Sequence, residues 1–252
     1  MNESMLSIAE DFQRYFTVEY AATPEQKAEV YSIRYRVYCE EFRYEPMDRF
    51  PAKQEWDDFD EISFHCLIRH KATNRGAGCV RLVPAGNKGI SHLPMEAFCG
   101  DNLDRKLLDS LHLNRETICE VSRLAVDGAF RRRAGEGRTR FGDVDAIDCS
   151  FHERRTFSLI SVAAYLAATS LTEITGMTMA FAMMEPFLPR LLAKSGIDFE
   201  KVGGEVDYHG LRAPYFSTTD KAIKGMLPNL RGLYEAIYPL VNSGYQTSVV
   251  NR

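Results

Sequence analysis

Two apolar, strand-like segments of this chain contain charged side chains, and this restricts the possible folds more than any other feature. Arg81 interrupts the segment CVRLV, and Glu120 and Arg123 interrupt the segment ICEVSRLAV. Burying a charge costs free energy unless a partner pairs with it and forms hydrogen bonds to it. The polar segment EWDDFDE offers Asp57 and Asp60 as partners. The sequence therefore predicts a fold that joins these segments in one ion-pair network.

The order of the predicted elements indicates an α+β fold. Strands are predicted where apolar and β-branched residues cluster between turn residues, at 16–22, 63–72, 77–85, 117–126, 177–185 and in a hairpin at 198–218. Helices are predicted where apolar residues recur at helical spacing, at 25–42, 157–176, 186–196 and 220–240. A helix before a run of antiparallel-type strands, with a second apolar helix after it, differs from the strict alternation of a doubly wound sheet.

Length and composition exclude several classes of protein. The chain has 252 residues, which suits one domain over 1–252, with insertions at about 86–116 and 127–155. The net charge is −4, so no general basic field points to nucleic acid. The apolar stretches are too short or too interrupted to span a bilayer. The beginning of the chain lacks the pattern of a signal peptide, and the six cysteines lack zinc-ligand spacing. We therefore expect a reduced, cytoplasmic protein without a metal.

Four short segments contain the candidate functional residues. They are Arg34-x3-Tyr38-x5-Tyr44, Glu55-x-Asp57-x2-Asp60, the strand residue Arg81, and Glu120-Val121-Ser122-Arg123. Each segment alone also fits an ordinary structural role. A helix surface, an N-cap or a structural ion pair would explain one of them at a time.

Together and in this order, the four segments resemble the acyl-homoserine-lactone synthases, the autoinducer synthase family of GNAT proteins. Tyr38 and Tyr44 stand where that family usually has Phe and Trp, whereas the acidic loop and the E-V-S-R strand match outright. The chain is longer and carries the two insertions. In this it looks more like the N-acyl amino acid synthases and the acyltransferases associated with PEP-CTERM/exosortase systems. The stretch YRVYCEEFRYEP is especially similar to the last group.

The resemblance implies a GNAT fold, with a mixed central sheet flanked by helices, and an N-acyltransferase activity. A fatty acyl group would pass from acyl carrier protein or coenzyme A to the amine of an amino acid or derivative, without a tightly bound cofactor. Glu120 would be the base, acting directly or through water, because an attacking amine must be neutral. Ser122 and Arg123 would complete the catalytic strand. The implied substrate-binding residues are Arg34, Tyr38, Tyr44, Asp57, Asp60 and Arg81.

The resemblance also implies how the thioester is held. Backbone donors would come from the β-bulge strand that carries Glu120 to Val126. Arg132-x2-Gly135-x-Gly137 fits the pyrophosphate loop of enzymes that use coenzyme A, although the next clearly apolar helix begins some twenty residues later. The arginines at this place equally fit a docking surface for acidic acyl carrier protein or a solvated loop. They are Arg131, Arg132, Arg133, Arg138 and Arg140.

Other interpretations of the sequence stay open. The apolar segments around 157–195 fit an acyl-chain tunnel or plain core. The activity could be that of an S-adenosylmethionine-dependent autoinducer synthase, and release of methylthioadenosine would identify it. A non-catalytic module that binds acyl chains or carrier protein, and an ordinary acetyl-coenzyme-A N-acetyltransferase, are the remaining alternatives.

Overall fold

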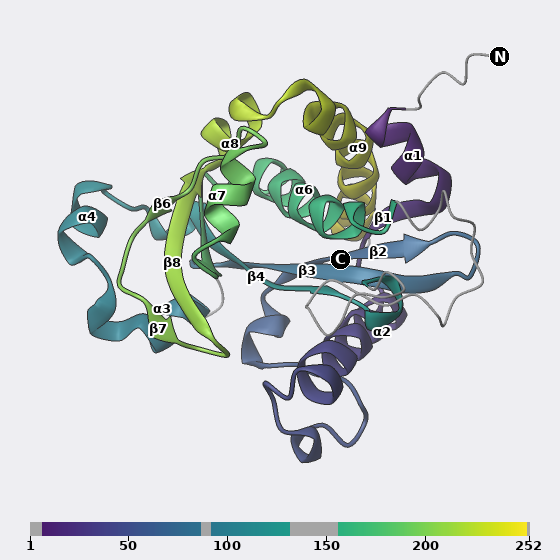
Figure 1. Ribbon diagram of the computed structural model, residues 1–252, viewed down its shortest axis with the longest axis horizontal. Coiled ribbons are helices and arrows are strands. Elements are labelled where there is room, and N and C mark those ends of the chain that lie inside the picture. Colours follow the sequence, from purple (N-terminus) through teal and green to yellow (C-terminus); the bar gives the residue numbers. More distant parts are fainter. Residues whose placement is uncertain (1–6, 87–91, 132–155, 251–252) are drawn as a thin grey trace.

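The computed structural model describes residues 7–86, 92–131 and 156–250, and in them one eight-stranded mixed sheet forms the centre of the molecule (Figure 1). The strand order is β1-β2-β3-β4-β5-β8-β6, and β7 pairs with β8. Neighbouring strands are antiparallel except for the parallel pair β4 and β5. The strands are β1 (Phe16–Tyr20), β2 (Phe64–His70), β3 (Arg75–Pro84), β4 (Ile118–Val126), β5 (Met179–Met184), β6 (Glu200–Lys201), β7 (Val206–Asp207) and β8 (Leu211–Thr218).

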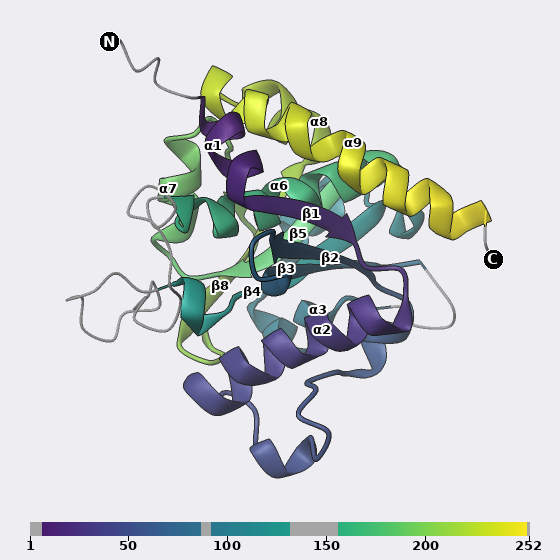
Figure 2. The same cartoon turned by 90° about the vertical axis from the view of Figure 1, so that its right-hand side faces the viewer.

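Helices cover both faces of the sheet. Figures 1 and 2 show α1, α6 and α9 on one face and α2 on the other. The helices are α1 (Ile8–Tyr15), α2 (Pro24–Arg34), α3 (Pro94–Cys99), α4 (Arg105–Ser110), α6 (Leu159–Ile174), α7 (Leu188–Ala193), α8 (Thr219–Gly225) and α9 (Pro228–Val250). The main core lies between α6, α9 and the sheet, where small residues such as Ala163, Ala164 and Ala167 let α6 approach closely.

Two helices differ from the sequence prediction. The helix predicted at 25–42 starts with the Thr23 hydroxyl accepting from the N–H of Gln26, but from Tyr35 to Glu41 it continues as a π-helix. The N–H of Phe42 there donates to the carbonyl of Val37 at 3.0 Å. The prediction of a single helix at 220–240 is wrong. The segment forms two helices, α8 and α9, because the residue before Pro228 disfavours the helical conformation.

The central strands β4 and β5 run together only briefly. They pair from Ile118 with Met179 to Glu120 with Phe181, and beyond this point β5 has no residue opposite β4. On its other edge β4 stays paired with β3, but two residues of β4, Arg123 and Leu124, lie opposite the single residue Val80 of β3. This is a β-bulge, and Arg123 adopts the left-handed φ of 51° there. The sequence prediction had placed the bulge in this strand.

Candidate active site

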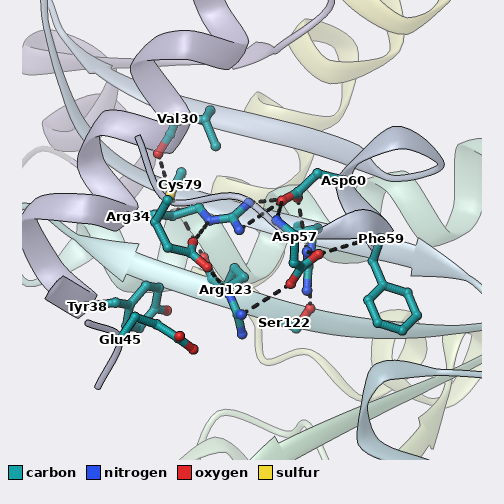
Figure 3. A network of polar contacts seen from close by, with 12 residues as sticks. Val30, Arg34, Tyr38, Glu45, Asp57, Phe59, Asp60, Cys79, Ser122 and Arg123 are labelled. Carbon is teal, nitrogen blue, oxygen red and sulfur yellow. Dashed lines mark hydrogen bonds and ion pairs between the residues drawn. The ribbon is translucent and has the colours of Figure 1, made fainter. Parts of the chain in front are cut away.

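Arg34, at the end of α2, is the centre of a buried charge network (Figure 3). Its two terminal nitrogens donate to the two carboxylate oxygens of Asp60 at 2.7 and 2.9 Å, and its Nε donates to Glu55. Burial alone would raise the pKa of Asp60. The guanidinium groups of Arg34 and Arg81 outweigh burial and hold this pKa well below its usual range. Asp60 is therefore a carboxylate at neutral pH, as the buried arginines require.

The other two arginines extend the network onto β3 and β4. Arg81 donates to Asp57 at 2.6 Å and to Asp60 at 3.0 Å, and its Nε donates to the Ser122 hydroxyl at 3.2 Å. Arg123 donates to Glu55 and to Asp57, both at 3.2 Å. The ion-pair network predicted from the charged strand residues is thus confirmed for Arg81 and Arg123. Glu120 was predicted to belong to it, but it forms no ion pair with a described residue and accepts a backbone hydrogen bond instead.

The acidic loop is folded so that its carboxylates face the arginines. Asp57 is the N-cap of a short 3-10 helix over Asp58–Glu61, and its side chain accepts from the N–H of Phe59 at 3.0 Å. The Asp60 carboxylate in turn accepts from the N–H of Asp57 at 2.8 Å. Both the capping role and the ion-pair role foreseen for this loop are therefore present in the same residues.

A cavity of about 680 Å³ lies where β4 and β5 part. Its lining includes Phe181 and Met183, from the sheet face that packs against α3, and Ala180 and Ala182, from the face that packs against α7 and the main core. The cavity therefore crosses the sheet through the opening between the two strands.

One side of α6 forms a wall of this cavity. The lining positions recur at helical spacing and are Ser158, Ser161, Val162, Tyr165, Ala168, Thr169 and Thr172. The remaining side of α6, with Ile160, Ala163, Ala164 and Ala167, belongs to the core. The sequence left the segment 157–195 open between an acyl-chain tunnel and plain core. In the structure, α6 has one side on the cavity and the other in the core, and the acyl-chain role stays a prediction. From Ser158 to Thr172 the wall extends roughly 20 Å along the helix axis.

Glu120 lies on the cavity wall at the last pair that joins β4 and β5. Its side chain is buried, and its Oε2 accepts from the N–H of Met95 at 2.7 Å. Burial raises the pKa of Glu120 to about 7, although the Met95 N–H, Arg81 and Arg123 act in the opposite direction. The sequence had left this balance open. At pH 7 a carboxyl with such a pKa can both accept and return a proton.

Tyr38 and Tyr44 lie on the cavity wall beside the bulge. The Tyr38 hydroxyl donates to the carbonyl of Leu124 at 2.9 Å, and the Arg123 guanidinium lies 5.7 Å from the centre of the Tyr38 ring. Tyr44 stacks on Tyr38 with 6.3 Å between ring centres, and on His209 with 4.7 Å. An aromatic surface therefore lines the cavity beside the bulge of β4, where the sequence predicts that the substrate binds.

The predicted site residues divide into two groups in the structure. Those that line the cavity are Tyr38, Tyr44, Glu120, Ser122, Arg123 and Val126. Those that lie behind its wall are Arg34, Asp57, Asp60 and Arg81. The second group holds β3, β4 and the acidic loop together.

Some cavity residues were not predicted from the sequence. Met95 contributes only a backbone N–H, which no side-chain pattern can reveal. Phe98, Tyr208 and His209 come from a short helix and a hairpin turn far along the chain. Arg212 could have been found, because it stands in β8 as a charge beside an apolar run, the same signal that pointed to Arg81.

The predicted phosphate loop, Arg132, Gly135 and Gly137, lies outside the described residues, as do Arg133, Arg138 and Arg140. Arg131 is described. It forms an ion pair with Glu41, and its guanidinium lies 4.8 Å from the centre of the Phe42 ring on the cavity wall.

The described residues contain neither a membrane-spanning helix nor a metal-binding cluster. None of the helices described is long and apolar enough to cross a membrane. Within the same residues, no three His, Cys, Asp or Glu side chains are grouped so as to hold a metal ion.

Residues 33–139 match the family model described as an acetyltransferase (GNAT) domain. No curated protein matches the chain. Among solved structures, the chain is similar to TofI in a ternary complex with an inhibitor and MTA, with a TM-score of 0.57 and 17% identity, covering 86% of this chain and 99% of TofI. It is also similar to FeeM, an N-acyl amino acid synthase from uncultured soil microbes, with a TM-score of 0.53 and 13% identity over 84% and 94% of the two chains.

A third similar structure is BjaI, a CoA-dependent acyl-homoserine lactone synthase with SAM and isopentyl-CoA. Its TM-score is 0.53 and its identity 14%, over 93% of this chain and 99% of BjaI. At these identities the likeness is one of fold. It confirms the predicted GNAT fold and the predicted similarity to autoinducer synthases.

Proposed function

We propose that this chain, which has the GNAT fold, is an N-acyltransferase that moves a fatty acyl group from an acyl thioester to the amine of an amino acid or a derivative. One observation carries the proposal: Glu120, with a pKa of about 7, lies on the wall of a long, largely apolar cavity at the point where β4 and β5 part. A base and an acyl-chain site thus meet at one place.

The reaction follows from this arrangement. Glu120 accepts a proton from the acceptor's ammonium group, directly or through water, because only the neutral amine is nucleophilic. The amine nitrogen attacks the thioester carbon, a C–N bond forms, and negative charge develops on the carbonyl oxygen. When the oxygen's electron pair re-forms the carbonyl, the C–S bond breaks, and the leaving thiolate takes up the proton that Glu120 holds. The nitrogen loses its remaining surplus proton to the Glu120 carboxylate or to water, so that one proton is released in the complete reaction. The products are an N-acyl amine and a free thiol.

The bulged strand would stabilise the oxygen in the intermediate. Beyond Glu120, no residue of β5 pairs with β4, so β5 does not occupy the backbone N–H groups on that edge of β4. Fixed N–H donors directed at a developing negative charge are a strong source of catalysis. Arg123 is held at the bulge by Glu55 and Asp57, and this keeps the strand in its strained conformation.

The acyl donor is proposed to be acyl carrier protein or coenzyme A carrying the acyl chain. The leucine side chains of α7, together with Val162 and Tyr165 of α6, offer that chain an apolar surface. Arg131 and the arginines after it in the sequence support an acidic carrier protein. BjaI, which is similar in fold, is a CoA-dependent enzyme, and this supports coenzyme A.

A second candidate is an S-adenosylmethionine-dependent acyl-homoserine-lactone synthase, since the similar structures of BjaI and TofI contain SAM and MTA, respectively. Detection of methylthioadenosine among the products would identify this reaction. A non-catalytic acyl-binding module is less well supported, because the charged strand residues and the base are in place.

The link to PEP-CTERM/exosortase systems and a cytoplasmic location belong to the same proposal. Five cysteines of the described residues are free and buried, which suits a reducing compartment.

The test is mass spectrometry of lipid extracts from cells that express the protein, together with thiol release by the purified protein from a series of acyl-CoA donors. We expect N-acyl amino acids with the wild type and their loss with Glu120→Gln. Glu116→Gln is the matched control, because Glu116 is exposed just before β4. If no N-acylated amine forms, and Glu120→Gln leaves the lipid profile unchanged, the proposal is wrong.

A further inference from the structure

The motif arginines already have carboxylate partners within the protein. Arg34 pairs with Glu55 and Asp60, Arg81 with Asp57 and Asp60, and Arg123 with Glu55 and Asp57. Arg34 and Arg81 are also completely buried and lie behind the cavity wall. An amino-acid acceptor carries a carboxylate beside its amine, and its recognition therefore needs a different cation on the cavity wall.

Arg212, at the start of β8, is such a cation. Its guanidinium lies 5.8 Å from the ring centre of Tyr44 and 5.9 Å from that of Tyr208, and all three residues line the cavity. Its Nε is buried and has no hydrogen-bond partner, and Arg212 forms no ion pair with any residue that the structure describes. A buried guanidinium nitrogen without a partner costs free energy until a ligand supplies an acceptor.

The position of Arg212 on the sheet matches this role. Its neighbour Ala213 packs with α7, so Arg212 points toward the opposite face. Glu120 points to that same face, where it meets Met95 at the start of α3. Ala213 pairs with Met184 and Glu120 with Phe181, so Arg212 and Glu120 lie about four positions apart along the strands, roughly 13 Å. They are also two strands apart, roughly 10 Å, which places their Cα atoms roughly 16 Å from each other. The guanidinium lies at the end of a long side chain, so it can be closer to Glu120 than the Arg212 backbone is.

Two aromatic rings beside the guanidinium restrict it to a small region. Tyr44 is held by stacking on Tyr38 and His209, and Tyr208 packs on Phe98 with 4.1 Å between ring centres. A guanidinium held in this way keeps its planar donors pre-oriented, which suits a carboxylate that accepts two hydrogen bonds at once.

We infer that Arg212 binds the carboxylate of the acceptor, so that the enzyme selects amines that carry a carboxylate next to the amino group. The inference rests on the proposed function and names the residue that would define its acceptor class. The same cation would also suit a phosphate of the acyl donor, and the experiment separates the two sources.

The experiment compares an amino acid with its carboxamide as acceptors, using the standard amino acid that the wild type acylates fastest. With the wild type we expect kcat/KM to be at least about tenfold higher for the amino acid. Arg212→Gln removes that preference through a higher KM for the amino acid, with little change for the carboxamide. Arg212→Lys restores part of the preference for the amino acid, because lysine keeps the positive charge but lacks the two parallel N–H donors of a guanidinium. Arg190→Gln is the matched control: Arg190 is exposed on α7 and does not line the cavity.

Different results would point elsewhere. An equal loss for amino acid and carboxamide overturns the inference. If that loss occurs with acyl-CoA but not with acyl-pantetheine, which lacks the phosphates, Arg212 binds the donor instead. Binding of the N-acyl amino acid and of its carboxamide, measured by calorimetry, does not depend on turnover. If the wild type binds the acid at least tenfold more tightly and Arg212→Gln does not, the inference holds even if the proposed reaction fails. Equal binding overturns it.

Discussion

The Oε2 atom of Glu120 accepts the backbone N–H of Met95 at 2.7 Å. This joins the proposed base on β4 to the segment between β3 and β4, one of the two insertions predicted from the sequence. The segment is itself fixed by Glu96, which accepts two hydrogen bonds from Arg115, at 2.8 and 2.9 Å. The insertion therefore helps to hold the base that the catalytic strand provides.

The first prediction concerns the pH dependence of catalysis. Glu120 must be ionised to accept a proton, so kcat should rise with pH through about 7 and level off above it. In Glu120→Gln this limb should disappear together with most of the rate. The measurement is kcat against pH at saturating acceptor and donor. A rate that is independent of pH between 5.5 and 8.5 would rule out Glu120 as the base.

The second prediction concerns stability. The pKa of Glu120 is about 7 in the folded protein and about 4.3 in an unfolded chain. The folded state therefore binds the extra proton between these values, and its stability falls as pH rises through them. Glutamine does not ionise, so Glu120→Gln should be more stable than the wild type by roughly 3–4 kcal/mol at pH 8. Urea unfolding at pH 8 and at pH 4 tests this, because the gain should vanish at the lower pH.

The third prediction concerns the buried network. Asp60→Asn leaves Arg34 and Arg81 buried with too little negative charge, and we expect a loss of about 3–5 kcal/mol, or about 10 °C in Tm. Because the pKa of Asp60 is lowered in the folded protein, this difference should persist above about pH 4 and shrink only in stronger acid. Asp220→Asn is the control, since its pair with Lys224 is exposed and contributes less than about 1 kcal/mol. Equal effects of the two substitutions in thermal unfolding would contradict the prediction.

The fourth prediction concerns the length of the acyl chain. Val162 lines the cavity from α6 and is only partly buried, and Val162→Phe would fill part of the cavity. Each excluded CH₂ group should cost about 0.8 kcal/mol, or about fourfold in kcat/KM. We expect the longest donors that the wild type accepts to lose at least about tenfold, while the shortest change little. Assays over a series of acyl-CoA donors measure this, and a uniform loss over all lengths would show that the cavity is not the chain site.

The sequence predicted the charge network because the rule behind it is local. A charge such as Arg81 or Glu120 in an apolar strand needs a partner wherever the strand lies, and its neighbours in the sequence show that it will be buried. The strands themselves were predictable for the same reason. Each keeps its pattern of apolar residues regardless of its neighbours in the sheet.

Other parts of the site depend on how distant segments meet. Whether β5 continues beside β4 beyond Phe181 is decided by tertiary packing, and neither strand shows it in its own residues. The Met95 N–H is a backbone group, identical for almost every residue type. The pKa of Glu120 could not be assigned because burial and nearby arginines act in opposite directions, and only the structure shows that burial is the larger effect.

The short pairing between β4 and β5 also has a mechanical consequence. The sheet consists of two parts, β1–β4 and β5–β8, that are joined by three residue pairs from Ile118 to Glu120. The thioester-bearing part of the donor, bound beyond Glu120, would lie between β4 and β5 where the two strands do not pair, and would contact both parts of the sheet. Binding of the donor would then stabilise the folded protein between the two parts of the sheet, before any bond is made or broken.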